Sequence, residues 1–494
     1  MSLDQNLPYR PHYCVWELTL ACNLRCGHCG SRAGRRRDNE LGTSECVDLV
    51  HQLADLECRL ITLSGGEPTL RPDWPLIARA AVARGVVVNM VTNGTTMTER
   101  LADRMADVGL SNVGISLDGS PAVHESIRGP GTFRKLVRAV GLLRDAGVAY
   151  GLLTHLNRDT LAELEDIHRL AVDLGAFSWR VQLGKPMGNL ADNRDLCIEP
   201  RDLLDALPRL ARIKKSSPIR VDVGDSIGYY GPHERVLRQT DWGNMRPLWS
   251  GCQAGRRAIG IESDGAIKGC LSLQGGRDEE SGRDVFFEDN IRRRSLREIW
   301  FDPQAFAFNR HQTVEDLTGF CRRCRHASLC RGGAKCVSSA YTGGVSEDPY
   351  CYWRVSRMAS RRGRAVAAVR QHAAVAAAAV TLGLGAAGAA CLGGCLDRAV
   401  GDPNPGRHQD AAPLVQSDAG VDADVDPPVH GDYGFFPEPV PNDAGVDADV
   451  DADAEPPNQM DYGFFPEPID TDAGVDPDAE PPVEMDYGDL PPGD

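Results

Sequence analysis

The segment TLACNLRCGHCGSR, residues 19–32, decides the fold class of this chain because it places three cysteines within eight residues. Three residues separate Cys22 from Cys26, and two separate Cys26 from Cys29. Three thiolates can hold three irons of a [4Fe–4S] cube and leave the fourth open, whereas structural zinc takes a closed set of four ligands. The triplet therefore favours an open cluster over two alternatives, a zinc site completed by His28 or a distant residue, and cysteines that only fill buried space.

The first half of the chain alternates between two kinds of apolar pattern. Six short apolar runs predict buried strands. They span residues 13–20, 60–65, 86–94, 112–119, 148–154 and 177–183. Amphipathic stretches between them predict helices, several of which end in Gly. Six β/α units predict an α/β fold with a parallel sheet, either a partly closed barrel or a doubly wound sheet. The triplet follows the first run, where both folds carry functional loops.

Charge divides the chain into a mildly basic body and a strongly acidic end. The 494 residues carry a net charge of −16, and residues 401–494 contain 25 Asp and Glu against one Arg, a net of −24. Residues 1–400 therefore carry +8. The end repeats itself, with DAGVDADVDPPVHGDYGFFPEP at 418–439 returning in altered form at 443–468 and 472–494. Such acid- and Pro-rich repeats cannot bury a core, so we expect residues 396–494 to be disordered.

Cysteine placement indicates a reducing compartment. The opening residues, MSLDQNLPYRPH, contain no apolar run of a secretory signal. Many of the sixteen cysteines stand in tight groups, 22/26/29 and 321/324/330/336, which in a reducing cytosol are more often metal or cluster sites than disulfides. We therefore expect a cytoplasmic catalytic region. We expect four isolated cysteines, at positions 14, 46, 58 and 197, to be buried small apolar residues.

The triplet and the motifs after it resemble those of the radical S-adenosylmethionine (SAM) superfamily. CNLRCGHC follows a WELT strand, SGGEP (64–68) ends the second strand, and TNG, SLDG and HESIRG follow further along. The resemblance covers residues 12–185 and implies a partial (β/α)6 TIM-like barrel. It implies a SAM-binding cluster on Cys22, Cys26 and Cys29. It also implies SAM contacts from Gly65, Gly66, Glu67, Asn93, Ser116, Asp118, Arg128 and, at the end of the sixth strand, Gln182.

The resemblance also implies a chemistry. Glu67 would pair with the methionine amino group of SAM, and Ser116 and Arg128 would contact its carboxylate or ribose. The open iron would chelate SAM and pass it one electron, and cleavage would yield methionine and a 5′-deoxyadenosyl radical that abstracts hydrogen. The protein would supply positioning and shielding, because the cofactors carry the hard chemistry. No catalytic side chain is identified.

A second group of cysteines, between residues 252 and 351, resembles the SPASM domain, a module of auxiliary iron–sulfur clusters. Its pattern is C-x(9–15)-G-x(4)-C, then C-x(2)-C-x(5)-C-x(3)-C, then a last cysteine. Here five residues, RGGAK, separate Cys330 from Cys336 instead of three. The resemblance implies an auxiliary cluster I on Cys252, Cys270 and Cys336 with an unidentified fourth ligand. It implies an auxiliary cluster II on Cys321, Cys324, Cys330 and Cys351.

A zinc ribbon is the alternative for the distal cysteines, built from residues 321, 324, 330 and 336. The domains expected along the chain are a radical SAM core, a bridge, a SPASM domain, a basic and then apolar segment, and acidic repeats. Their boundaries are 12–185, 186–250, 251–355, 360–395 and 396–494.

The acidic repeats suggest a substrate fused to its enzyme. DYGFFPEP occurs twice and DYGDLPPGD once, and the YGDL ending is similar to that of the GDL-motif class of precursors linked to such maturases. Tethering raises the local substrate concentration to about millimolar for a short flexible linker. Candidate modified residues are Tyr433, Phe435, Phe436, Tyr462, Phe464, Phe465 and Tyr487, with their Asp neighbours. Calcium binding by the Asp repeats is disfavoured because they lack the glycine of an EF-hand loop.

Residues 360–395 allow two other interpretations. SRRGR, an Ala/Gly-rich run and GAACLGGC, with Cys391, resemble a twin-arginine or lipoprotein export signal, which would make the repeats a solvated stalk. The uncharged run 373–395 is also long enough to contact or span a membrane, with the enzyme on the cytoplasmic side.

The favoured function is a radical SAM/SPASM maturase that modifies a ribosomal peptide or protein, with residues 396–494 as a candidate substrate in cis. The alternatives are a maturase of a separate protein, as sulfatase-maturing enzymes are, and a membrane-tethered iron–sulfur electron carrier or sensor. The enzyme would need an electron donor such as flavodoxin or ferredoxin. We expect no nucleic-acid partner.

Overall fold

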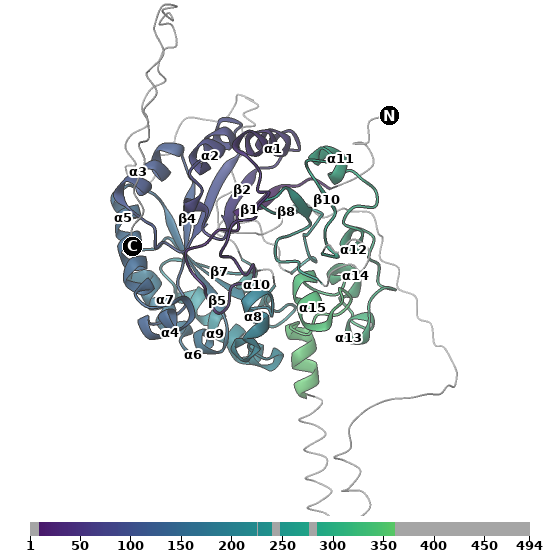
Figure 1. The fold of residues 1–494 in the computed structure, drawn as a ribbon. Helices are drawn as coiled ribbons and strands as arrows, with labels where there is room; N and C mark the ends of the chain where they lie inside the picture. The colour runs from purple at the N-terminus through teal and green to yellow at the C-terminus, as the bar shows by residue number, and fades with distance from the viewer. Residues whose placement is uncertain (1–8, 225, 240–247, 276–283, 361–494) are drawn as a thin grey trace, which may run out of the picture. The chain divides into compact units, whose positions relative to one another are not determined.

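The computed structural model describes residues 9–224, 226–239, 248–275 and 284–360, which contain one ten-stranded sheet (Figure 1). Its order is β10-β9-β8-β1-β2-β3-β4-β5-β6-β7, and β1 to β7 pair in parallel with their neighbours. The strands are β1 Tyr13–Thr19, β2 Leu60–Gly65, β3 Val87–Thr92, β4 Asn112–Ser116, β5 Tyr150–Leu156, β6 Ser178–Leu183, β7 Arg220–Val223, β8 Ala258–Ile261, β9 Ala266–Lys268 and β10 Asp289–Asn290.

Helices follow the strands of the first half along the outer side of the curved sheet (Figure 1). They are α1 Thr43–Asp55, α2 Trp74–Ala83, α3 Glu99–Val108, α4 Pro121–Arg128, α5 Thr132–Asp145, α6 Arg158–Ala162 and α7 Leu164–Asp173. The fold is thus α/β with a partial barrel, and the predicted six β/α units are confirmed.

The local sequence explains why these elements form. Every residue of β4, NVGIS, is buried, as expected of a strand covered on both faces. In α3 the buried residues Ala102, Met105 and Val108 recur at helical spacing. Gly109 then ends α3 with a left-handed φ of 79°, a conformation that glycine adopts without steric cost.

Residues 186–250 were expected to be a bridge but contain part of the barrel. They hold α8 Gly188–Asp192, α9 Leu203–Ser216, β7 and α10 Glu234–Arg238. β7 extends the parallel sheet beyond β6, with Val221 opposite Trp179. The strand RVDV is too short and too charged for its sequence to predict it, and only pairing with β6 makes it a strand.

The cysteine-rich region, residues 252–351, joins the other end of the same sheet. β8 pairs in parallel with β1, so that Tyr13 lies opposite Ala258 and Trp16 opposite Ile261. Short helices follow the antiparallel pair β9 and β10. They are α11 Leu296–Trp300, α12 Ala307–Arg310, α13 Gly319–Arg322, α14 Ala327–Cys330 and α15 Lys335–Thr342.

The four isolated cysteines at positions 14, 46, 58 and 197 are buried free thiols, as expected. Across the described ranges, no helix has both the length and the apolar character needed to cross a bilayer. The predicted apolar segment 373–395 and the acidic repeats 396–494 lie outside the described residues.

Candidate active site

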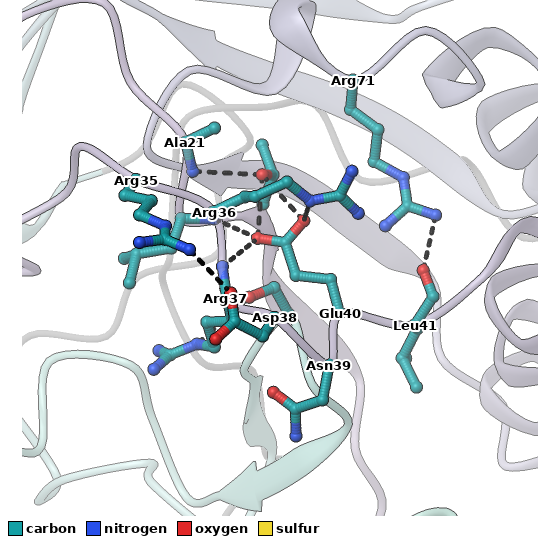
Figure 2. A network of polar contacts seen from close by, with 12 residues as sticks. Ala21, Arg35, Arg36, Arg37, Asp38, Asn39, Glu40, Leu41 and Arg71 are labelled. Atoms are coloured by element: carbon teal, nitrogen blue, oxygen red, sulfur yellow. Dashed lines mark hydrogen bonds and ion pairs between the residues drawn. The ribbon is translucent and has the colours of Figure 1, made fainter.

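The cysteine triplet occupies a loop at the carboxyl end of β1, held by the segment that follows it. Cys22 N donates to Gly34 O at 3.0 Å, which closes the loop on itself. The buried Glu40 carboxylate, in the polar network of Figure 2, accepts from Leu20 N and Thr19 Oγ1, both at 2.9 Å. These hydrogen bonds therefore fix the start of the loop that carries the cysteines.

The two glycines of SGGEP let that loop cross β2 at close range. Glu67 N donates to Ala21 O at 2.7 Å. A Cβ on Gly66 would lie 2.1 Å from Ala21 O, and Gly65 has a φ of 120°. Both positions exclude a larger residue. The sequence suggested a close approach to a ligand; the approach that the structure shows is to the triplet's own backbone.

The Glu67 side chain turns into the protein instead of lining the cavity described below. It is fully buried, and its carboxylate accepts from Thr69 Oγ1 at 2.6 Å, Thr92 Oγ1 at 2.7 Å and Asn93 N at 2.8 Å. Burial raises its pKa, which these hydrogen bonds oppose. The carboxylate ties β2 to β3, and its contact with the amino group of SAM stays a prediction.

Asn93 connects the end of β3 to the triplet loop. Its Nδ2 donates to Asn23 Oδ1 at 2.9 Å and lies 4.0 Å from the Cys22 sulfur. Its Oδ1 accepts from Thr95 N at 2.8 Å, which fixes the orientation of the amide. The predicted Asn93 therefore lies beside the predicted cluster ligand Cys22.

Asp118 links two strand ends to the triplet through a buried charged network. Its Oδ2 accepts from Arg128 Nε at 2.6 Å and from His28 Nε2 at 2.7 Å, and its Oδ1 accepts from His155 N at 2.9 Å. Burial raises the pKa of Asp118, but Arg128 and His28 outweigh it and hold that pKa well below its usual value. Predicted residues Asp118 and Arg128 thus lie together, and the buried Ser116 ends β4 next to them.

His28 is a residue that the sequence suggested only as a zinc ligand. Its Nε2 donates to the Asp118 carboxylate, which leaves the other ring nitrogen, Nδ1. Nδ1 is buried and has no hydrogen-bond partner among the described residues. The ring lines the cavity described next and packs on His155, with ring centroids 4.5 Å apart.

A cavity of about 400 Å³ lies at the carboxyl ends of the strands, where such folds bind ligands. Gly65 and Gln182, both predicted SAM contacts, line it together with His28 and Lys185. Cys270 to Ser272 and Gln274 of the cysteine-rich region form its other side. The cavity therefore lies between the barrel strands and the cysteine-rich region, within the volume range of small-molecule sites.

A short helix far along the chain holds the triplet loop, and the sequence contained no sign of it. In α8, Asn189 N donates to Cys29 O at 2.8 Å and Asn189 Nδ2 to Cys26 O at 3.0 Å. Asn193 Nδ2 donates to Gly27 O at 3.0 Å. No sequence motif marks these residues, because each bond spans more than 150 positions.

The distal cysteines separate into the two predicted sets. One cavity of about 80 Å³ is lined by Cys252, Cys270 and Cys336 and shares Gln182 and Lys185 with the larger cavity. A second, of about 10 Å³, is lined by Cys321, Cys324, Cys330 and Cys351. In the described part of the chain, no three Cys, His, Asp or Glu side chains converge tightly enough for a single metal ion.

The unusual spacing before Cys336 is accommodated at the start of α15. The family pattern would place this cysteine at position 334, which is Ala in this chain. Ala334 and Cys336 line the same 80 Å³ cavity. Between them, Lys335 Nζ donates to Gln312 Oε1 and Arg331 O, and burial lowers the pKa of Lys335 to about 8.

The donor sets fit iron–sulfur clusters. Backbone N–H groups point at the thiols of both regions, with Leu24 N, Ala33 N and His326 N each 3.4 Å from the sulfurs of Cys22, Cys29 and Cys324, respectively. Such donors stabilise ligand sulfurs that carry negative charge. Burial raises the pKa of Cys26 to about 11, and Arg128 opposes that shift. Three thiols stand at the barrel and seven in the cysteine-rich region.

Comparison with known proteins supports this assignment. The sequence pattern of the radical SAM superfamily matches residues 16–171, and that of the SPASM iron–sulfur cluster-binding domain matches residues 252–325. The chain is 31% identical over 357 residues to the AdoMet-dependent heme synthase of Methanosarcina barkeri, covering 70% of this chain and 97% of that protein. It is 32% identical over 356 residues to the mycofactocin maturase MftC of Mycobacterium tuberculosis, covering 71% and 85%.

Solved structures share the fold at low identity. Streptococcus suis SuiB bound to S-adenosylmethionine superposes with a TM-score of 0.56 at 15% identity, covering 70% of this chain and 78% of SuiB. The enzyme anSMEcpe with bound AdoMet gives 0.54 at 17% identity, covering 72% and 98%. This chain belongs to the radical SAM superfamily, as an enzyme with an iron–sulfur SPASM domain that uses S-adenosylmethionine and [4Fe–4S] clusters.

Proposed function

We propose that this enzyme modifies a peptide by radical chemistry, and that its own acidic repeats are the substrate. The observation that carries the proposal is the 400 Å³ cavity, which opens between the strand ends and Cys270 of the cysteine-rich region. A peptide side chain that enters it reaches the barrel residues and the predicted auxiliary site I from one position. The relative MftC is named as a maturase, which favours a peptide over a small metabolite.

In this proposal Cys22, Cys26 and Cys29 hold the SAM-binding cluster, and Cys252, Cys270 and Cys336 hold auxiliary cluster I. Cys321, Cys324, Cys330 and Cys351 hold auxiliary cluster II. When bound, the clusters and SAM supply one-electron reduction and a carbon-centred radical that abstracts hydrogen.

The chain's own residues supply orientation and exclusion of water. Asn93 and α8 hold the triplet loop at fixed distance from β3 and β6. Asp118 accepts hydrogen bonds from Arg128 and His28 and so keeps both in place, with the His28 ring lining the cavity. On the opposite wall Arg37 Nη2 donates to Glu17 Oε1 at 2.9 Å, which neutralises that carboxylate.

The test is anaerobic reconstitution of the full chain with iron, sulfide, SAM and a reductant. We expect 5′-deoxyadenosine to form and peptides from residues 418–494 to change in mass or fragmentation. The variant C22A/C26A/C29A should abolish both. If 5′-deoxyadenosine forms while every repeat peptide keeps its mass, fragmentation and stereochemistry, the repeats are not the substrate.

A second candidate substrate is a tetrapyrrole. The similarity to the heme synthase covers 97% of that protein, and the Fe-coproporphyrin III synthase of Methanosarcina barkeri is 30% identical over 356 residues. A variant lacking residues 401–494 distinguishes the two candidate substrates, because it removes the repeats and keeps all of the described residues. Turnover of iron-coproporphyrin III by this variant would favour the tetrapyrrole, and turnover of an added repeat peptide would favour the peptide.

A further inference from the structure

The cysteines of predicted auxiliary site II lie beneath an exposed basic surface. We call Arg322, Arg323, Arg325 and Arg357 the arginine patch; all four are exposed, and none forms an ion pair with a carboxylate of the described residues. Arg325 and Arg357 lie against one indole, with Cζ atoms 4.4 Å and 4.3 Å from the ring centroid of Trp353. Cation–π contacts of this kind hold two of the charges in place.

The negative groups near the arginine patch leave it a net positive charge. Glu347 already accepts from Arg354 Nε at 2.9 Å and from Phe320 N at 3.2 Å. Glu315 interacts with Arg322, and the exposed Asp316 accepts from Thr313 N at 2.8 Å. Four cations thus face two exposed carboxylates. Unpaired surface charge of one sign attracts partners of the other sign and raises their rate of encounter.

Aromatic rings connect the arginine patch to the cysteines. His326 stacks on Tyr230 with ring centroids 4.2 Å apart and an interplanar angle of 3°, and its edge meets Trp353 at 5.5 Å. Tyr230 lines the same cavity as the four cysteines. α13, which ends at Arg322, and α14, which follows His326, lie on the side of the cysteine-rich region that faces away from the barrel strands (Figure 1). The rings of His326 and Tyr230 therefore connect this surface to the cavity lined by the four cysteines.

We propose that the arginine patch docks an acidic electron-carrier protein of the flavodoxin or ferredoxin class. One electron passes from the reduced carrier to the oxidised cluster held by Cys321, Cys324, Cys330 and Cys351, so the carrier is oxidised by one electron and no bond forms or breaks. The inference rests on the predicted cluster site but not on the identity of the substrate. Electron-transfer encounters are typically small, transient and steered by charge, which matches an exposed patch without a deep groove.

The test compares two reductants with the full-length reconstituted enzyme. Cluster reduction is followed by stopped-flow absorbance, first with reduced flavodoxin and then with dithionite, a small reductant that needs no docking surface. For the variant R322E/R323E/R325E we expect the flavodoxin rate to fall roughly tenfold or more at low salt. The rate with dithionite should stay the same. The wild-type flavodoxin rate should fall as salt rises.

The matched control is R134E/K135E/R138E, which reverses three exposed cations on α5 and changes the net charge by the same amount. We expect it to keep the wild-type flavodoxin rate; an equal loss in this control would overturn the proposal. If the patch variant loses iron, R322E/R323E tests the same surface without touching the Trp353 contact. An unchanged flavodoxin rate in a patch variant overturns the proposal, even where that variant loses binding to anionic vesicles or duplex DNA.

Discussion

Gly188 shows how one residue can decide the geometry of the cysteine loop. Its φ is 52°, and a Cβ there would lie 2.4 Å from both Cys29 O and Gly30 O. The backbone of α8 thus touches the backbone of the triplet, and the hydrogen bonds of Asn189 depend on this approach.

We predict that Gly188→Ala reduces the iron bound at the triplet and lowers the free energy of unfolding by about 2 kcal/mol or more, because backbone atoms must move apart. Gly85→Ala is the matched control. Gly85 has a φ of 73° but nothing within 4 Å of its Cβ position, so only about 1 kcal/mol of backbone strain is expected. Iron content, the electron paramagnetic resonance signal and urea unfolding measure both. Equal effects of the two substitutions would contradict the argument.

The burial of Glu288, in the cysteine-rich region, lowers the free energy of unfolding by an amount that depends on pH. Burial raises its pKa to about 7 from the usual 4.5, although Phe306 N donates to its Oε2 at 2.8 Å. The folded state therefore binds the proton more tightly than the unfolded state. Stability is greatest below the unfolded pKa and falls as pH rises toward the folded pKa.

We predict that Glu288→Gln is about as stable as the wild type near pH 5 but more stable by about 1 kcal/mol near pH 8. Glutamine keeps the hydrogen bond without the charge. Urea unfolding at several pH values measures the difference. A difference that does not grow with pH would show that ionisation of Glu288 carries no such penalty.

At the scale of the element, the start of α15 decides where the last ligand of auxiliary site I stands. Ala334 N donates to Asp348 Oδ2 and to Tyr229 Oη, both at 3.1 Å, immediately before the helix begins at Lys335. Cys336 follows within the first turn and faces the same cavity as Ala334. The helix therefore places Cys336 at the site where the family pattern expects a cysteine at position 334.

We predict that Cys336→Ala removes the iron of auxiliary site I and that Ala334→Cys in the same chain restores it. The rescue follows because both positions line one cavity. Iron per chain and Mössbauer spectra measure the outcome. Cys197→Ala, at a buried cysteine outside the predicted sets, is the control and should retain all iron. Full iron content in Cys336→Ala would exclude this residue as a ligand.

At the scale of the whole molecule, the barrel and the cysteine-rich region differ in the length of their helices and strands. The barrel has strands of up to seven residues, and its apolar core continues into the cysteine-rich region at residues such as Ile259, Trp300 and Val337. Most elements of the cysteine-rich region are shorter: α11 to α14 have four or five residues and β8 to β10 two to four, and only α15 reaches eight. Short helices and strands add little stability by themselves. We therefore expect metal ligation to contribute much of the folding stability of the cysteine-rich region.

We predict that anaerobic removal of iron by a chelator unfolds the cysteine-rich region before the barrel. Hydrogen exchange should rise first in peptides from 284–360 and only later in β1 to β6. Limited proteolysis should cut the same region. Simultaneous exposure of both regions would show that the shared sheet, through the β1–β8 pair, makes them one cooperative unit.

The sequence by itself determined whatever depends on neighbours along the chain. Alternating apolar periods predict β1 to β6 and their helices, and the cysteine spacings predict the two kinds of site, because periodicity and spacing are local properties. They predict the fold class, and the resemblance that they carry implies the family and the three cysteine sets.

Only the tertiary structure decided the features that join distant segments. β8 extends the sheet beside β1, β7 extends it beside β6, α8 holds the triplet loop, and Glu67 turns inward. Each depends on contacts between backbones or buried side chains from different parts of the chain. Those contacts form only when packing and hydrogen bonding are satisfied together, and no local pattern in the sequence records them.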